Sequence, residues 1–144
     1  MNKGMIQRMK RILVIDAQGG GIGRQLVTNI KNEIRDCEVT AVGTNTAATA
    51  AMRKAGADYC ATGENSVVVA CRRADVIIGP IGIVIADSML GEITPAMAKA
   101  VAQADAMRIF IPFSSCANYI AGVDDFSTGH LIEAALRHLK NNLK

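Results

Sequence analysis

The sequence predicts a three-layer α/β domain with a doubly wound parallel sheet of about five strands. Short apolar segments alternate with helical patterns along the chain, and in such an alternation each helix returns the chain to begin a new parallel strand. The predicted core is aliphatic, because half of the residues are hydrophobic whereas aromatic residues make up only 3% and tryptophan is absent. Parallel strands that are buried on both faces commonly have this composition.

The first predicted strand and helix enclose a glycine-rich turn. Residues 11–16 are the strand, and the turn at 19–23 is glycine at every position except Ile22. Apolar residues then recur at every fourth position from 22 to 34, which is typical of a helix with one buried stripe.

The next two strands and helices follow the same pattern. Residues 38–43 are a predicted strand, and Thr44 or Asn45 can cap the alanine-rich helix after it. Residues 58–61 are a short predicted strand. The segment 62–65 then resembles the start of a third helix.

A fourth strand is predicted at residues 75–79. The apolar stretch 80–91 that follows has no clear periodicity, and we expect it to be buried or to contact a second copy of the chain. Thr94-Pro95 then marks a helix start, because threonine is a good cap and proline suits the first helical turn.

The C-terminal part contains a fifth predicted strand and the last helix. The strand spans residues 107–113, and a further short edge strand is expected at 119–123. The last helix carries an apolar face from Leu131 to Leu139.

Parallel strands end at one common edge of the sheet, and in this class of fold ligands bind there, near the reversal in strand order. The predicted loops at that edge begin at Gln18, Thr44, Thr62, Pro80 and Ser114. We therefore expect the functional site among these loops.

Length and composition exclude several classes of protein. The 144 residues fit one domain, which we place at 9–144 after a flexible lead-in at 1–8. A net charge of +3 is too diffuse for a nucleic-acid surface, and no apolar run approaches the roughly 20 residues of a membrane span. The four cysteines form no CxxC pair, which predicts free thiols, no metal site and a cytoplasmic protein.

The glycine-rich turn indicates a phosphate ligand. Glycines let the backbone approach the ligand, and a helix N-terminus offers unpaired N–H groups and partial positive charge. The alternative is that the glycines only allow a tight turn and close packing of the helix on the strand. Three consecutive glycines favour the phosphate interpretation, because a tight turn alone does not require so many. Each glycine costs about 0.5–1 kcal/mol of backbone entropy relative to alanine.

A dinucleotide is less favoured by the same region. The usual fingerprint requires a third glycine where Arg24 stands, and the second strand ends in Gly43-Thr44-Asn45 without the acid that binds a ribose. Asn45 could bind a ribose or only cap the helix. Reductase chemistry is also unsupported. Four residues after Tyr119 the chain has Val123, where reductases that use a catalytic tyrosine of this kind carry a lysine.

Three further features near the expected site allow alternative interpretations. Asp16 would repel a phosphate, so it either binds a magnesium ion or, as we favour, accepts N–H groups of the turn. The segment 79–82 is either a rigid platform for a base or ribose or a plain exit from the sheet. Cys116 is the only thiol expected at this edge, and His130 could act as its base.

The chain resembles an uncharacterised family of short bacterial proteins, domain of unknown function 3842, in the segments IDAQGGGIG, GTNTAATAAMRKAGA, ATGENSVVV, ADVIIGPIGIVIADSMLGEITP and IPFSSC…YIAGV. The resemblance covers residues 10 to about 138. It implies a small stand-alone Rossmann-like protein in the cytoplasm, with no established activity and no catalytic residues to transfer. A second resemblance, to short-chain dehydrogenases, covers only residues 12–27.

We therefore predict a cytoplasmic, homo-oligomeric protein that binds a nucleotide or another phosphorylated small molecule, with nucleotide and dinucleotide both open as cofactors. Open alternatives are an NAD(P)-linked reductase or small transferase with unconventional catalytic residues, and a structural subunit without a ligand. No nucleic acid, membrane or metal is expected, and no catalytic residue is assigned. The predicted binding residues are Asp16, Gln18, Gly19, Gly20, Gly21, Ile22, Gly23, Arg24, Thr44, Asn45, Thr62, Gly63, Glu64, Asn65, Gly79, Pro80, Gly82, Ser114 and Cys116.

Overall fold

The computed structural model describes residues 8–113 and 118–143. At its centre is a five-stranded, all-parallel sheet in the order β3-β2-β1-β4-β5. The strands are β1 (Lys10–Asp16), β2 (Cys37–Gly43), β3 (Tyr59–Thr62), β4 (Val76–Pro80) and β5 (Met107–Ile111). The helices are α1 (Gly21–Glu33), α2 (Thr46–Lys54), α3 (Glu64–Arg73), α4 (Pro95–Gln103) and α5 (Thr128–Asn142), with a 3-10 turn η1 (Ile81–Val84) after β4.

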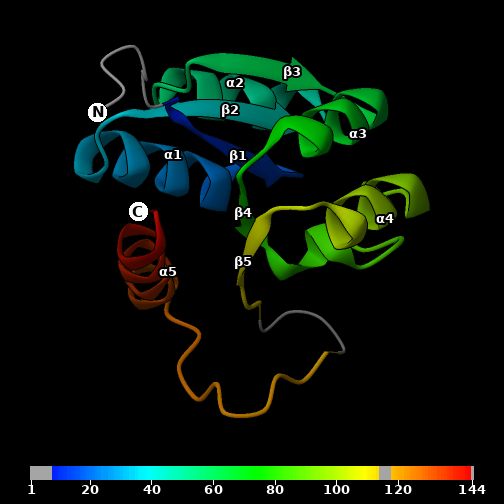
Figure 1. The fold of residues 1–144 in the computed structure, drawn as a ribbon. Helices are drawn as coiled ribbons and strands as arrows, with labels where there is room; N and C mark the ends of the chain where they lie inside the picture. The colour runs from blue at the N-terminus through cyan, green and yellow to red at the C-terminus, as the bar shows by residue number, and fades with distance from the viewer. Residues whose placement is uncertain (1–7, 114–117, 144) are drawn as a thin grey trace.

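Helices cover both faces of the sheet and give the domain three layers (Figure 1). On one face α1, α2 and α5 bury Leu26, Met52 and Leu136 in a common apolar cluster. On the other face α3 and α4 bury Val67 and Met97 in a second cluster. The predicted fold class, a doubly wound Rossmann-like sheet in a single domain, is confirmed.

The sheet places the carboxyl ends of the strands at one edge. β1 pairs with β2 along its whole length, from Lys10 opposite Cys37 to Asp16 opposite Gly43. On its other side β1 pairs with β4, so the strand order reverses between these two strands. Such a switch point is where ligands of open α/β sheets bind.

Two predictions at the C-terminal side of the sheet were wrong. β5 ends at Ile111 rather than at Phe113, because Pro112 has no N–H to donate to a strand ladder. Residues 118–123 form no strand. The segment is irregular, with a turn at residues 121–122, and Tyr119 is 86% exposed. Gly122 has a φ of 86°, a left-handed conformation that does not occur in regular strands.

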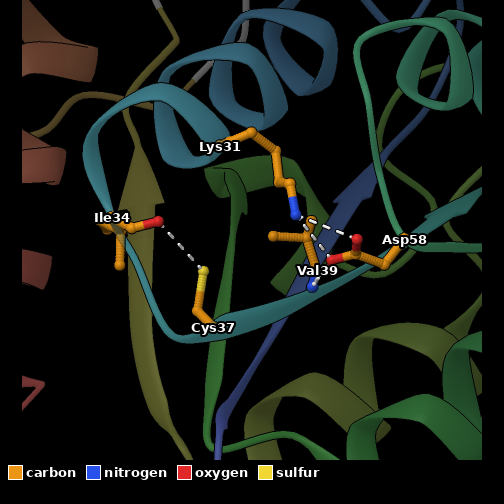
Figure 2. A network of polar contacts seen from close by, with 5 residues as sticks. All are labelled: Lys31, Ile34, Cys37, Val39 and Asp58. Atoms are coloured by element: carbon orange, nitrogen blue, oxygen red, sulfur yellow. Dashed lines mark hydrogen bonds and ion pairs between the residues drawn. The ribbon is translucent and has the colours of Figure 1, made fainter.

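Paired polar groups link neighbouring elements at the opposite edge of the sheet, where the amino ends of the strands lie. Figure 2 shows Asp58, which accepts hydrogen bonds from the Val39 N–H at 2.8 Å and from the Lys31 ammonium at 3.0 Å. Burial opposes ionisation of Asp58, but these two donors hold its pKa below the usual value. Asp58 therefore stabilises the start of β2 and ties it to α1.

Arg8 belongs to the same edge. It was predicted to lie in a flexible lead-in, yet its guanidinium forms two hydrogen bonds with the Asp75 carboxylate, at 2.9 and 3.0 Å. The remainder of that predicted lead-in, residues 1–7, lies outside the described residues. Among the residues that the structure describes, no helix has the length and apolar character needed to cross a membrane.

Candidate functional site

The glycine-rich turn is built around the buried carboxylate of Asp16, the last residue of β1. Asp16 is only 4% exposed, and its two oxygens accept the N–H groups of Ala17 at 2.8 Å and Gly23 at 2.6 Å. Burial raises the pKa of Asp16 above its ordinary value, although both N–H groups favour the carboxylate. Of the two roles considered for Asp16, the structure supports the one in which it stabilises the turn. In the described part of the chain, no group of three His, Cys, Asp or Glu residues is arranged to hold a metal.

Two of the four glycines in the turn are required by packing. A Cβ on Gly23 would lie 2.6 Å from the Met52 sulfur and 2.8 Å from the Asp16 Cβ, so α1 could not approach β1 and α2 as closely. Gly20 has a φ of 73°, and a Cβ there would lie 2.9 Å from the Cα of Ala48. The packing alternative is therefore correct for these two positions.

The other two glycines, Gly19 and Gly21, face open space within the part of the chain that the structure describes. A Cβ on either would have no atom of that part within 4 Å. Their backbone N–H groups, and that of Ile22, make no hydrogen bond within the described residues. Since α1 begins at Gly21, these N–H groups lie at its positive end, and no acidic residue occupies its first turn.

These open groups border a cavity of about 450 Å³ at the switch point between β1 and β4. The walls come from the turn after β1, the end of β4, the loop after η1, and the residues just after β5. The lining residues are Asp16, Ala17, Gln18, Gly19, Gly20, Gly21, Ile22, Pro80, Gly82, Met89, Leu90 and Phe113. The lining of the cavity thus combines backbone donors that have no partner within the described residues with apolar side chains.

The loop after η1 covers the cavity in a strained conformation. Three of its non-glycine residues, Asp87, Met89 and Leu90, have positive φ values of 66°, 54° and 58°. Such backbone costs of order 1–3 kcal/mol per residue and is concentrated at ligand-binding segments. Of the two outcomes expected for this apolar stretch, burial holds for Ile83, which lies in the core, and not for Leu90, which is 95% exposed. Contact with a second copy of the chain stays a prediction.

Glu92, at the end of this loop, binds the loops after β1 and β2. Its Oε1 accepts the Gln18 N–H at 2.8 Å, the Thr44 hydroxyl at 2.6 Å and the Asn45 amide Nδ2 at 2.8 Å. The Thr44 hydroxyl, followed by the Gln18 N–H, holds the pKa of Glu92 below its usual value. The predicted binding residues do not include Glu92, because an acid just before a helix start is already favoured by that helix. Nothing local in the sequence indicates that it would reach two other loops.

The predicted binding residues after β2 and β3 are not part of this cavity. Asn45 caps α2 by accepting the Ala48 N–H at 2.8 Å, which supports the second of its two predicted roles. The Thr62 hydroxyl pairs with the Thr49 hydroxyl at 2.6 Å, and the Gly63 N–H donates to the Gly43 carbonyl.

Asn65 lines a separate cavity of about 510 Å³, against the α3 side of β1, β2 and β3. Glu64 occupies the first turn of α3, next to Asn65. The structure therefore divides the predicted binding residues into two groups.

The remaining predicted residues have different placements. Arg24 is exposed on the first turn of α1 and does not line the cavity. Gly79 allows β4 to lie close to β1, because a Cβ there would collide with the Ile15 carbonyl oxygen. Ser114 and Cys116 lie outside the described residues.

The sequence prediction also missed Met89, Leu90 and Phe113 as lining residues. They were part of apolar segments, and hydrophobicity alone does not distinguish a wall of a cavity from a core position.

Comparison with known proteins identifies the family. A family model described as "Domain of unknown function (DUF3842)" matches residues 11–144. The chain therefore belongs to this family, as its resemblance predicted. No curated protein sequence matches the chain.

Two solved structures are similar to the chain. One is a wide-type short-chain dehydrogenase/reductase from Veillonella parvula DSM 2008 in complex with NADP, with 15% identity and a TM-score of 0.50 over 89% of this chain and 64% of the other. This chain thus spans less than two thirds of that protein. The other is a dodecameric FMN-dependent Ubix-like decarboxylase from Escherichia coli O157:H7, with 17% identity and a TM-score of 0.47 over 92% and 77%. With 15% identity, the match to the dehydrogenase/reductase supports a similar fold and nothing beyond it.

Proposed function

We propose that the protein binds a nucleotide or another phosphorylated small molecule in the cavity between the turn after β1 and the end of β4. One observation carries this proposal: the N–H groups of Gly19, Gly21 and Ile22 have no partner within the described residues and border a cavity of about 450 Å³. Unpaired donors of this kind, at the positive end of a helix, suit an anion. A phosphate ester would satisfy them.

The apolar wall of the cavity suits the organic part of such a ligand. Pro80, Met89 and Phe113 also line the cavity, and ligand cavities are commonly apolar with a few placed polar groups. Arg24 adds a positive charge on the same turn of α1. A ligand in the cavity would contact the strained loop at Met89.

A binding or sensing role is favoured over an enzymatic one. Asp16, the only ionisable side chain among the described residues that line the cavity, is 4% exposed and has both carboxylate oxygens bonded to backbone N–H groups. A general base or nucleophile would need an accessible lone pair directed at the ligand. Asp16 therefore supports the turn and does not offer catalytic chemistry.

Isothermal titration of ligand-free protein tests this proposal. The panel contains inorganic phosphate, AMP, NMN and FMN, together with adenosine as the unphosphorylated partner of AMP. We expect saturable binding of at least one phosphate-bearing compound, and weaker binding of adenosine than of AMP if AMP is the compound that binds. If no phosphate-bearing compound binds, the proposal is wrong.

A further inference from the structure

We infer that Glu92 limits the ligand to a single phosphate-bearing half, such as a mononucleotide, and excludes dinucleotides. The inference rests on the proposed function, because it concerns the size of the ligand in the same cavity. It follows from where the cavity lies, from which groups Glu92 holds, and from how firmly the backbone fixes Glu92.

A dinucleotide needs room on both sides of the turn after β1. In dinucleotide-binding sheets the pyrophosphate lies on that turn, and one ribose extends to the end of the second strand, where an acid accepts its hydroxyl groups. In this protein the second strand ends in Thr44 and Asn45, and Glu92 reaches these residues from the loop after β4. A carboxylate is therefore present at the ribose position, but it comes from a different loop.

The hydrogen bonds of Glu92 join the turn after β1 to the loop after β2, across the path that a ribose would take. Its Oε1 accepts three donors, whereas one carboxylate oxygen offers about two lone-pair directions, so this oxygen is fully used and the bonds hold the side chain in place, while Oε2 has no partner within the described residues. The Asn45 Nδ2 donates to Glu92 and also to the Gln18 carbonyl, and the Asn45 Oδ1 accepts the Ala48 N–H. A ribose that took the place of the Glu92 side chain would have to break these bonds, and the partly buried donors of Thr44 and Asn45 would then need new partners.

The cavity itself extends to the other side of the turn. Its walls include Pro80 and Gly82 after β4 and Phe113 after β5, but neither Thr44 nor Asn45. Its volume of about 450 Å³ lies toward the small end of the usual range for ligand cavities, roughly 300–1,000 Å³. One phosphate-bearing half fits this arrangement, with the phosphate at the N–H groups and the organic part toward β4 and β5.

The position of Glu92 is fixed by its own loop. The next residue, Ile93, is fully buried in the α3/α4 cluster, and its carbonyl accepts the Asp87 N–H at 2.7 Å. The Ser88 hydroxyl donates to the Gly82 carbonyl at 2.5 Å and holds the other end of the loop. Glu92 therefore closes the β2 side of the site as part of an ordered loop, and its three bonds define the boundary.

Matched ligand pairs test the inference on the unmodified protein. NMN and NAD share one half, as do FMN and FAD, and in each pair the second compound adds AMP. If a pair binds, we expect its mononucleotide to bind at least tenfold tighter than its dinucleotide. If neither pair binds, we expect inorganic phosphate or AMP to bind. A dinucleotide that binds as tightly as its half overturns the inference but leaves the proposed function intact. Absence of binding by every compound overturns both.

Two variants of Glu92 then identify the residue responsible. Glu92→Ala removes the acceptor of all three bonds, and we expect the preference for the smaller ligand to fall by about tenfold or more. Glu92→Gln is the matched variant, because its side-chain oxygen can still accept from Gln18, Thr44 and Asn45, and the preference should remain. If Glu92→Ala instead weakens dinucleotide binding, Glu92 is a ribose ligand and the inference is wrong. Circular dichroism checks that both variants fold, and the matched pairs on the unmodified protein still decide the inference if either does not.

Discussion

The two halves of the sheet edge where the strands end use their polar groups in opposite ways. In the half after β2 and β3, side chains and backbone bind one another, as in the contacts of Glu92 with Thr44 and of Thr49 with Thr62. In the half between β1 and β4, the N–H groups of Gly19, Gly21 and Ile22 have no partner within the described residues and border a cavity. Both halves come from strand–loop–helix units of the same kind.

The difference shows that the helix starts at this edge are not equally suited to an anion. α3 begins at the same edge as α1, but an acidic residue, Glu64, occupies its first turn, and a negative side chain there already satisfies the positive end of the helix. α1 has no acid in its first turn. The acid beside it, Asp16, is instead directed inward, where it holds the Gly23 and Ala17 N–H groups.

The largest expected effect comes from filling the open half. Gly21→Val would place a branched side chain in the space beside the unpaired N–H groups, where a Cβ has no neighbour within 4 Å. We expect phosphate-ligand affinity to fall by about 100-fold or more, which corresponds to roughly 2.7 kcal/mol, because the ligand loses several charge-assisted hydrogen bonds.

Gly129→Val is the matched control for this variant. It makes the same exchange at an equally open helical position in α5, and titration should show unchanged affinity. If Gly21→Val binds as tightly as the unmodified protein, the phosphate does not occupy this half.

The second prediction removes the inward carboxylate that shapes the turn. Asp16→Asn keeps the shape of the side chain but replaces one acceptor oxygen with an N–H₂ group, which would face a backbone N–H. We expect a loss of about 2 kcal/mol in the free energy of unfolding, because a buried donor is left without an acceptor. Chemical denaturation measures it, and Asp124→Asn, which changes an exposed aspartate, should alter stability by less than about 0.5 kcal/mol. Equal losses in the two variants would contradict the role assigned to Asp16.

The third prediction separates two glycines of the same turn. Gly23→Ala places a methyl group 2.6 Å from the Met52 sulfur and 2.8 Å from the Asp16 Cβ. We expect it to destabilise the protein by about 1–3 kcal/mol, as overpacking usually does. Gly21→Ala meets no atom and should leave stability unchanged or raise it by up to about 1 kcal/mol, because alanine favours the helix. Equilibrium unfolding of both variants tests the distinction, and a reversed order would show that the packing of the turn is wrongly assigned.

The smallest effect is a difference in pH dependence between two carboxylates. Burial raises the pKa of Asp16, so its contribution to stability is present below the ordinary value of 3.8 and decreases as the pH rises through the folded-state pKa. Donors hold the pKa of Glu92 down, so its contribution is present above the ordinary value of 4.5 and is lost as the pH falls through its lower folded-state pKa. The stability differences between the unmodified protein and Asp16→Asn or Glu92→Gln should therefore change in opposite directions across this acidic range. Unfolding at a series of pH values measures both, and parallel changes would contradict the assignment.

Most of the fold follows from periodicity in the sequence. The five strands and five helices occur where the alternation of apolar segments and helical stripes predicts them, with the Asn45 and Thr94 caps in place. The exceptions have local causes. β5 stops before Pro112, and the expected strand at 119–123 is a turn around Gly122.

The site was predictable only where it is local in sequence. The turn from Asp16 to Gly23 is a short continuous segment, and its chemistry can be recognised from its residue types. Glu92 reaches this turn across 74 positions of sequence, and only the tertiary arrangement of the loop after β4 makes the contact. The same long-range contact decides that Thr44 and Asn45, which were predicted to bind the ligand, are bonded to protein.

The central claim is that phosphate binds the open half of this edge and not the half closed by Glu92. A two-dimensional ¹⁵N–¹H NMR titration of ligand-free protein with inorganic phosphate tests it directly. We predict saturable shifts in the amide signals of Gly19, Gly21 and Ile22, with the signals of Thr44, Asn45 and Gly63 unchanged. Saturable shifts at Gly63 or Asn45 without shifts at Gly19 and Gly21, or no saturable shifts at all, would contradict the claim.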